Sequence, residues 1–328
     1  MMRNRIHFAS RRSVLVALLA QAGVAAMAQD VVPARALRIV VPFPPGGLND
    51  SVGRLLADAM APALGQAVVI DNRSGAAGLI GTQAVATAAP DGGTMLLTST
   101  SNHVLAPLTQ AAEKDPTADL VPVGLALRTV GVLVVGKDVP ARSLAEFVTL
   151  ARSQPRVLNF ASSGPGSANH LQTQQFATLA GIELVHVPYR GGGPLMAALM
   201  AGEVQFALLD YASAASAIAS GRVRALAQTG TRRHVALPSV PTLAESGYSS
   251  FDPVFWIGLA APPATSVAIV ARWNAALNSA LAQTALKARA QALGWTLVGG
   301  PPEVLARTVT QDREAFKTTA ASLRAERP

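Results

Sequence analysis

The segment "IVVPFPPGGLND", residues 39–50, leads from an apolar β-strand straight into a turn rich in proline and glycine. The two prolines fix the direction of the chain, and the two glycines remove side chains, so another group can approach the backbone closely. Asn49 or Asp50 can then cap a helix predicted over residues 51–64. Free N–H groups at the positive end of that helix would attract a carboxylate or a phosphate. A capped turn that binds nothing is the alternative.

The sequence after this turn alternates between strand-like and helix-like patterns. Helical apolar spacing over 51–64 is followed by the strand-like run "AVVIDN", a helical segment over 79–89 and the run "TMLLTST". "VGVLVVGKDV" and "VLNFASSG" begin a second series, with a helix over 143–153 between them. Such alternation predicts an α/β fold with parallel sheets and helices on both faces.

The pattern changes toward the C-terminus, where a proline-rich connection precedes the strand-like run "FWIGLAA". One long amphipathic helix is predicted over 266–293 and another over 302–324, with Glu303 in its first turn. A chain of this length is expected to form two lobes, and two chain crossings between them would make a hinge. The expected lobes are residues 29–128 plus 241–328 for lobe 1 and residues 129–240 for lobe 2.

The first 28 residues are typical of an export signal. Four arginines precede an apolar stretch, and residues 26–28 match an A-x-A cleavage site. The stretch is shorter and richer in Ala and Gly than the roughly 20 strongly apolar residues of a membrane span. "SRRSVLV", residues 10–16, also resembles a twin-arginine signal, so the Sec and twin-arginine routes both stay open. Either route predicts a periplasmic protein with a cleaved signal peptide.

Composition limits the classes of partner. Removing residues 1–28 takes away four arginines and no acid, so the formal charge falls from +8 to +4 (23 basic minus 19 acidic residues). The remaining basic residues are scattered, and only three Tyr and three Trp occur, which argues against nucleic acid as a partner. Because the chain has no cysteine, disulfides, catalytic thiols and Cys-ligated metals are excluded.

Four strand-to-helix loops carry the candidate binding groups, because ligands of open parallel sheets bind beyond the carboxyl ends of the strands. Besides the opening turn, these are "TSTSN" at 98–102, "ASSGPGSANH" at 161–170 and "VPYRGGGP" at 187–194. Closing the lobes would bring hydroxyls, helix N-termini and Arg190 around one small anion. The alternatives are hydroxyls that satisfy only local backbone groups and a surface arginine. Asp210, which ends the strand "FALLD", either lines the cleft or caps the next helix.

Enzyme motifs are missing from the sequence. It contains no G-x-S-x-G elbow, no H-E-x-x-H and no Walker loop, and "GAAGLIG" at 75–81 lacks the spacing of a dinucleotide site. One enzymatic alternative stays open: a periplasmic enzyme that acts on an organic acid through Ser162 or Ser163 with His170. A capping or packing role for His170 competes with it.

Six motifs taken together carry a family resemblance: "VPFPPGGLND", "VIDNRSGAAGLIGTQAVATAAPDGGTMLL", "ASSGPGSANHL", "VHVPYRGGGP", "LPSVPTLAESGY" and "FWIGLAAPPAT". In this order they resemble the Bug-type periplasmic receptors of tripartite tricarboxylate transporters, over nearly the whole mature chain. The resemblance implies a two-lobed periplasmic binding protein of the crossover, type II kind. It implies capture of a small organic acid, held largely by backbone N–H groups and ordered water, and delivery to a large and a small membrane subunit.

The resemblance and the loops together define the expected ligand-binding residues. They are Phe43, Gly47, Leu48, Asn49, Asp50, Ser99, Thr100, Ser162, Ser163, Gly164, Gly166, Ser167, His170, Tyr189, Arg190 and Asp210. No catalytic residue, cofactor or metal is expected, and the protein is expected to act as a monomer. The acid itself stays open among dicarboxylates, tricarboxylates, amino acids and aromatic acids. Gly93, Gln174 and Gln205 depart from the family pattern, and a receptor that feeds a membrane sensor is a further alternative.

Overall fold

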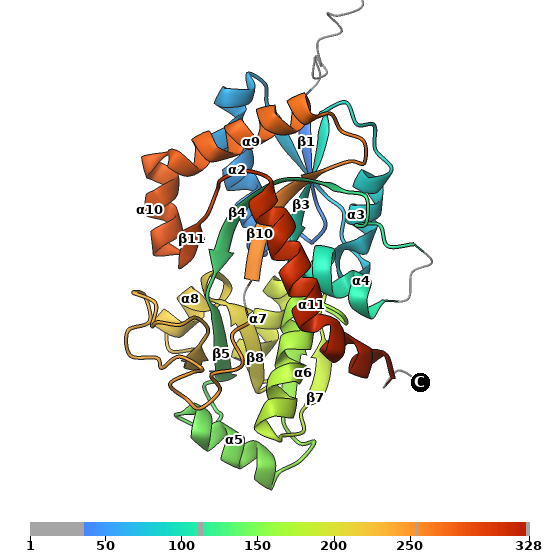
Figure 1. The fold of residues 1–328 in the computed structure, drawn as a ribbon. Helices are drawn as coiled ribbons and strands as arrows, with labels where there is room; N and C mark the ends of the chain where they lie inside the picture. Colours follow the sequence, from blue (N-terminus) through green and yellow to red (C-terminus); the bar gives the residue numbers. More distant parts are fainter. Residues whose placement is uncertain (1–35, 111–113, 254, 326–328) are drawn as a thin grey trace, which may run out of the picture.

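The computed structural model describes residues 36–110, 114–253 and 255–325, and the expected signal peptide lies outside these ranges. Within them, two β-sheets flanked by helices form two lobes, one above the other in Figure 1. None of the helices in the described ranges has the length and apolar character that crossing a membrane requires.

The first lobe is built on a six-stranded sheet with the order β11-β4-β10-β3-β1-β2. Its strands are β1 (Leu37–Val41), β2 (Val68–Asn72), β3 (Thr94–Ser99), β4 (Val121–Thr129), β10 (Phe255–Ala261) and β11 (Trp295–Leu297). Its helical segments are α2 (Leu48–Leu64), η2 (Ala76–Gly78), α3 (Leu79–Ala86), η3 (Thr100–Leu105), α4 (Ala106–Thr109), α9 (Val267–Ala282), α10 (Thr284–Ala292) and α11 (Glu303–Ala325).

The second lobe is built on a five-stranded sheet with the order β7-β6-β8-β5-β9. Its strands are β5 (Gly131–Gly136), β6 (Asn159–Ser162), β7 (Val185–Pro188), β8 (Phe206–Asp210) and β9 (Val223–Gln228). Its helices are α5 (Leu144–Ser153), α6 (Ala168–Ala180), α7 (Gly192–Ala201) and α8 (Tyr211–Ala219).

Each sheet contains one strand inserted against the direction of its neighbours. β10 lies antiparallel between β3 and β4, and β5 lies antiparallel between β8 and β9. Both inserted strands are the first that the chain forms after it crosses from the other lobe. Phe255 of β10 pairs with Thr129 of β4, so the two crossings run side by side. This arrangement confirms the predicted two-lobed crossover fold.

The packing of residues 241–251 bears on where the second crossing lies. Leu243 and Phe251 are buried in the core of the second lobe, and Tyr248 packs against the same cluster. Thr242 forms an isolated bridge with Gln228 of β9. This packing favours a return crossing after Phe251, later than the predicted boundary at residue 240.

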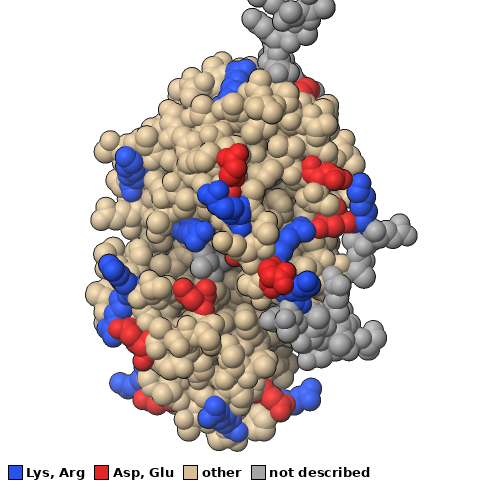
Figure 2. Space-filling model, in the orientation of Figure 1, with Lys and Arg blue, Asp and Glu red and all other residues tan. Residues whose placement is uncertain are grey.

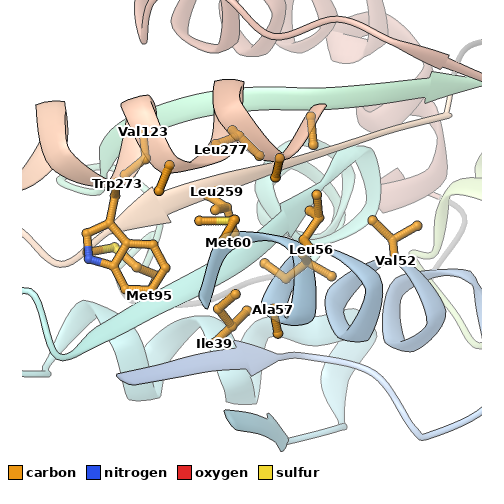
Figure 3. Close-up of a cluster of buried hydrophobic side chains, with 14 of the residues drawn as sticks. Ile39, Val52, Leu56, Ala57, Met60, Met95, Val123, Leu259, Trp273 and Leu277 are labelled. Carbon is orange, nitrogen blue, oxygen red and sulfur yellow. The ribbon is translucent and has the colours of Figure 1, made fainter. Parts of the chain in front are cut away.

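The core of the first lobe explains how α2 is positioned. Val52, Leu56 and Met60 recur every four residues and are buried against the sheet, next to Trp273 of α9 (Figure 3). Each such side chain contributes about 1.5–3 kcal/mol through burial. A Cβ on Gly53 would lie 2.9 Å from Cγ2 of Val41, so only glycine lets α2 approach β1 this closely. The apolar face therefore fixes the direction in which α2 begins.

The long helix predicted over 266–293 is wrong in one respect, because two helices occupy this range. Gln283 separates α9 from α10 with an extended backbone, at φ −64° and ψ 133°. Its side-chain Nε2 donates to the carbonyl of Ala59, 2.9 Å away. The apolar spacing continues through the break, so the sequence pattern alone does not show it.

The C-terminal helix α11 links the two lobes, and Figure 1 shows it running across the face of the molecule toward α6. Leu305 and Phe316 of α11 share one apolar cluster with Leu171 of α6. Within the first lobe, Trp256 Nε1 of β10 donates to Asp312 of α11 at 2.6 Å. The interface between the lobes therefore includes packed side chains beside the hinge.

We predict that His103 makes stability fall as the pH drops. Burial, assisted by the positive charge of Arg313, lowers the pKa of His103 from 6.5 to about 4. Between pH 6.5 and 4, His103 is therefore protonated in the unfolded chain but neutral in the folded chain. The free energy of unfolding falls as the pH drops through this range. Between about pH 7.5 and 5, wild type should lose about 2 kcal/mol more unfolding free energy than His103→Gln in urea titrations. Equal losses in both proteins would contradict this assignment.

Candidate functional site

A cavity of about 100 Å³, here called the inner cavity, lies between the lobes at the carboxyl ends of the parallel strands. Both lobes contribute to it through the loops that follow β1, β3, β6, β7 and β8, and through the start of β10. The lining residues are Phe43, Pro44, Pro45, Gly47, Leu48, Asn49, Ser101, Ser163, Ala168, Asn169, Arg190, Gly191, Gly192, Gly193, Pro194, Leu209, Asp210, Ser213 and Phe255.

A second, larger space of about 930 Å³, here called the outer groove, adjoins the inner cavity. The two spaces share Phe43, Pro44, Ser163, Arg190 and Gly191. A group held in the inner cavity can therefore extend past these shared residues into the outer groove.

Three helices point uncapped N-termini at the inner cavity. α2 begins after Gly47, α6 after Ser167 and α7 after Gly191, and in none of them does the N-cap side chain accept a hydrogen bond from the first turn. Ser143 caps α5 and Ser266 caps α9 through their side chains, away from the cavity, whereas α3 and α10 also begin without such a bond. The first N–H groups of a helix need partners, and the positive end of the helix dipole favours an anion as that partner. The N-termini of α2 in lobe 1 and of α6 and α7 in lobe 2 would therefore all favour an anionic acceptor in the cleft.

Asp50 holds the opening turn in place. One of its carboxylate oxygens accepts from the Gly46 N–H and from Arg54 Nε, and the other accepts from Arg54 Nη2 and Asn72 Nδ2, all at 3.0 Å. Burial alone would raise the pKa of Asp50, but the hydrogen bonds from Arg54, Gly46 and Asn72 hold it below 3.8. Asn72 also donates to the carbonyl of Phe43 at 3.0 Å. The carboxylate therefore supports the turn from behind and does not line the cavity.

Direct contacts join the lobes beside the inner cavity. The N–H of Ala168, in the first turn of α6, donates to Ser101 Oγ of the other lobe at 3.0 Å. A Cβ on Gly166 would lie 2.9 Å from Thr109 Oγ1, and one on Gly191 would lie 3.3 Å from Pro44. Glycine at these two positions lets the loops of lobe 2 come this close to lobe 1.

Two charged residues line the inner cavity, and they have opposite signs. Arg190 is exposed, and within the described ranges no ion pair to it is recorded. Asp210 caps α8, where its carboxylate accepts from Ser213 N at 2.9 Å and from Ser213 Oγ at 2.7 Å. Burial raises the pKa of Asp210, although the bonds from Ser213 oppose this. Arg190 is thus the one lining side chain whose charge is free to meet an anion.

The structure brings many of the expected ligand-binding residues together. Those that line the inner cavity are Phe43, Gly47, Leu48, Asn49, Ser163, Arg190 and Asp210. Gly164 and Tyr189 line the outer groove only. The expected residues that line neither space are Asp50, Ser99, Thr100, Ser162, Gly166, Ser167 and His170.

The expected residues outside both spaces bond to other protein groups. Ser99 donates through N and Oγ to Asn102, and Thr100 Oγ1 accepts from the N–H of Trp256. These bonds lie at the start of the helix η3, where a loop was expected. Ser167 Oγ donates to the carbonyl of Gly164 at 2.6 Å. Their hydroxyls thus shape the loops, as the alternative of local backbone bonding anticipated.

The serine–histidine contact within lobe 2 differs from the pair considered in the sequence, which was Ser162 or Ser163 with His170. Ser162 Oγ lies 2.6 Å from His186 Nε2, whereas His170 Nδ1 accepts from the Gly166 N–H at 3.1 Å. The two histidine rings stack with centroids 3.9 Å apart, and burial lowers the pKa of His186 to about 4. Because Ser162 is fully buried, no substrate can reach its hydroxyl in this structure.

Several lining residues were not among the expected ones. Ser101 came from the quoted run "TSTSN", but a single sequence does not show which hydroxyl faces the cleft. Asn169 and the three glycines after Arg190 lay in quoted loops, and their helix-start pattern was the available signal. Phe255 begins the quoted run "FWIGLAA", but a single sequence does not show that the start of this strand reaches the cavity.

Two crossover α/β lobes with a cleft between the carboxyl ends of their strands are typical of periplasmic solute-binding proteins. The comparisons with known proteins agree. BugD, solved as a periplasmic binding protein, has a TM-score of 0.81 and 32% identity, and the alignment covers 88% of this chain and 98% of that one. MatC from Rhodopseudomonas palustris, solved with bound malate, has a TM-score of 0.84 and 33% identity, and covers 88% and 99%.

The sequence comparisons define the family. The tripartite tricarboxylate transporter family receptor matches residues 52–311. The protein of the tcbD-tcbE intergenic region of Pseudomonas sp. (strain P51) is 39% identical over 289 residues, which are 88% of this chain and 86% of that protein. This chain therefore belongs to the tripartite tricarboxylate transporter receptor family, whose members are solute-binding receptors.

We predict that Asp50→Asn destabilises the protein by about 1–3 kcal/mol, because Gly46, Arg54 and Asn72 lose the charged acceptor that they share. Asp58→Asn is the matched control, since Asp58 lies on the same helix but is exposed. It should change stability by less than about 0.5 kcal/mol. Urea unfolding at neutral pH measures both, and equal stabilities for the two variants would show that the Asp50 bonds do not hold the turn.

Proposed function

We propose that this protein captures a small carboxylate in the inner cavity and delivers it to the large and small membrane subunits of a tripartite transporter. One observation carries the proposal: three uncapped helix N-termini from both lobes meet with Arg190 around a single cavity. The malate bound by MatC, a relative of similar fold, supports a carboxylate as the ligand. Phosphate is the main competing anion for such a site.

The affinity that this site can provide follows from its hydrogen bonds. Each charge-assisted bond contributes roughly 1.5–3 kcal/mol when water is excluded. About four such bonds, less the cost of ordering the ligand and the loops, support micromolar binding at about −8 kcal/mol. The site therefore needs no metal or cofactor to hold an acid.

Closure of the lobes couples binding to delivery. The Gly47 turn belongs to lobe 1 and Arg190 to lobe 2, so only the closed form lets both contact one ligand. A ligand that contacts both lobes shifts the equilibrium toward that form. The membrane subunits can then distinguish the loaded receptor by its closed shape.

The proposal also includes export of the receptor to the periplasm and binding of the acid without a chemical reaction. The first 28 residues would be removed after Sec or twin-arginine export, and the mature receptor would act in the periplasm as a monomer. No covalent step is assigned to the site, because the serine nearest to a histidine nitrogen is buried behind it. The receptor would release the acid chemically unchanged.

We predict that at least one carboxylate raises the melting temperature of the mature protein. Malate, adipate, 3-phenylpropionate, glutamate and citrate form a suitable panel, with inorganic phosphate as the competing anion. A ligand at about 100 times its dissociation constant adds about 2.7 kcal/mol of stability. Differential scanning fluorimetry detects such a shift. If phosphate alone stabilises the protein, or if no acid does, the carboxylate proposal fails.

We predict that Gly47→Val abolishes capture without unfolding the protein. The backbone of Gly47 is extended, at φ −89°, and a Cβ there would meet nothing within 4 Å. The valine side chain would therefore occupy the inner cavity in place of the ligand. Melting of the ligand-free variant should stay close to wild type, while isothermal titration with the stabilising acid should show at least about a hundredfold loss of affinity. Unchanged affinity would place the ligand elsewhere.

A further inference from the structure

The inner cavity is lined by two opposite charges that do not pair with each other. Arg190 and Asp210 both line it. Within the described part of the chain, no ion pair joins either side chain to the other or to a third residue. A charge that loses water without gaining a partner costs free energy, so a ligand gains by pairing with each of them. The ligand that matches this lining carries a negative and a positive group of its own.

Asp210 is the buried member of this pair, with 8% of its surface exposed. Its carboxylate accepts from the N–H and the hydroxyl of Ser213, which are both uncharged donors. Burial raises the pKa of Asp210, and only hydrogen bonds from Ser213 and from its own backbone oppose this rise. A carboxylate offers about four acceptor positions, so these bonds leave room for a further donor. An ammonium group would supply both that donor and the missing positive charge.

A second acceptor in the cavity lining also lacks a donor. Asn49, in the first turn of α2, lines the inner cavity. In the described structure its Oδ1 is buried and has no hydrogen-bond partner. Buried polar atoms almost always have partners, and for a lining residue a donor on the ligand can be that partner. Asn49 of lobe 1 and Asp210 of lobe 2 thus place acceptors on both sides of the cavity.

The charge of Asp210 disfavours a ligand that carries only negative groups. Such an acid would bring a second negative charge into a space of about 100 Å³, where like charges repel more strongly than in water. An α-amino acid carries an ammonium group one carbon away from its carboxylate. The carboxylate can face the N-termini of α2, α6 and α7, while the ammonium group faces Asp210.

The volume of the inner cavity suits a charged head group. It is smaller than the roughly 150 Å³ of an engineered cavity that holds benzene, so it encloses the two charged groups and the carbon between them. The remainder of a larger amino acid would continue past Phe43 and Arg190, which the two spaces share, into the outer groove.

We propose that the ligand of this receptor is an α-amino acid whose ammonium group binds Asp210 in the inner cavity. This inference rests on the proposed function, because the carboxylate of the same head group occupies the anion site at the helix ends. It makes Asp210 a specificity-determining residue, which separates amino acids from acids of the same skeleton that have no ammonium group.

The test compares aspartate, malate and succinate on the mature protein by isothermal titration. The three acids share one four-carbon skeleton and differ at the second carbon, which carries an ammonium group, a hydroxyl group or only hydrogen. We expect aspartate to bind at least about tenfold more tightly than succinate, and more tightly than malate, because a hydrogen bond between two charged groups is stronger than one from a hydroxyl.

The outcomes separate this inference from the proposed function. If malate or succinate binds as tightly as aspartate, the amino-acid inference is overturned while the carboxylate receptor stands. If none of the three binds, glutamate must bind more tightly than every panel acid without an ammonium group, and any other order overturns the inference alone. Silence across all of these acids overturns both.

A matched pair of variants tests the role of Asp210. Asp210→Asn removes the charge but keeps an oxygen that can cap α8, since asparagine caps helices about as well as aspartate. Asp91→Asn makes the same change at a carboxylate that accepts from the Gly93 N–H at 2.8 Å and lines neither space. Melting of the ligand-free variants shows whether each is folded.

The two variants should differ in how they bind aspartate. Asp210→Asn should weaken aspartate at least about tenfold and bind succinate at least as tightly as wild type does, because the repulsion between like charges is gone. Asp91→Asn should leave both affinities within about twofold. Equal losses of both acids in folded Asp210→Asn, or an unchanged affinity for aspartate, would show that Asp210 does not bind the ammonium group.

Discussion

The need of backbone N–H groups for partners is the constraint on which this structure depends. Most helices satisfy the N–H groups of their first turn with a capping side chain or with water. Here α5, α8 and α9 use Ser143, Asp210 and Ser266, while α2, α6 and α7 begin at residues whose side chains accept no such bond. The ends of α2, α6 and α7 meet at one cavity, whereas α3 and α10 also begin without such a bond and do not line it. An anion in this cavity would supply acceptors for helix ends from both lobes at once.

The sequence predicts the architecture because the fold follows from local signals. Alternating strand and helix patterns, glycine-rich turns at strand ends and proline-marked helix starts lie within short windows, and they correctly indicate two α/β lobes. The crossing strands and the helix break at Gln283 cannot be predicted from such short windows. A strand that returns from the other lobe looks locally like any strand, and at the break between α9 and α10 Gln283 bonds to Ala59, more than 200 positions away in the sequence.

The site was only partly predictable, for a similar reason. A strand-to-helix loop can be recognised from its composition, but the side chain that faces the cleft depends on the register of the turn. "TSTSN" contains four hydroxyls, and Ser99 and Thr100 face protein groups while Ser101 reaches the cavity. Asp50 is visible as a candidate in the sequence, yet its carboxylate is occupied by four protein donors. Such competition among partners becomes apparent only when distant residues such as Asn72 are in place.

The contacts across the cleft show how closure and binding depend on each other. The Ala168 N–H, one of the first donors of α6, is already satisfied by Ser101 of the other lobe. Closing the lobes therefore supplies an acceptor for one of the first N–H groups of α6. α11 adds apolar contact between the lobes through Leu305 and Leu171, so closure does not depend on the ligand alone. A ligand that contacts both lobes therefore adds to an interface that the protein already forms, and it shifts the equilibrium further toward the closed form.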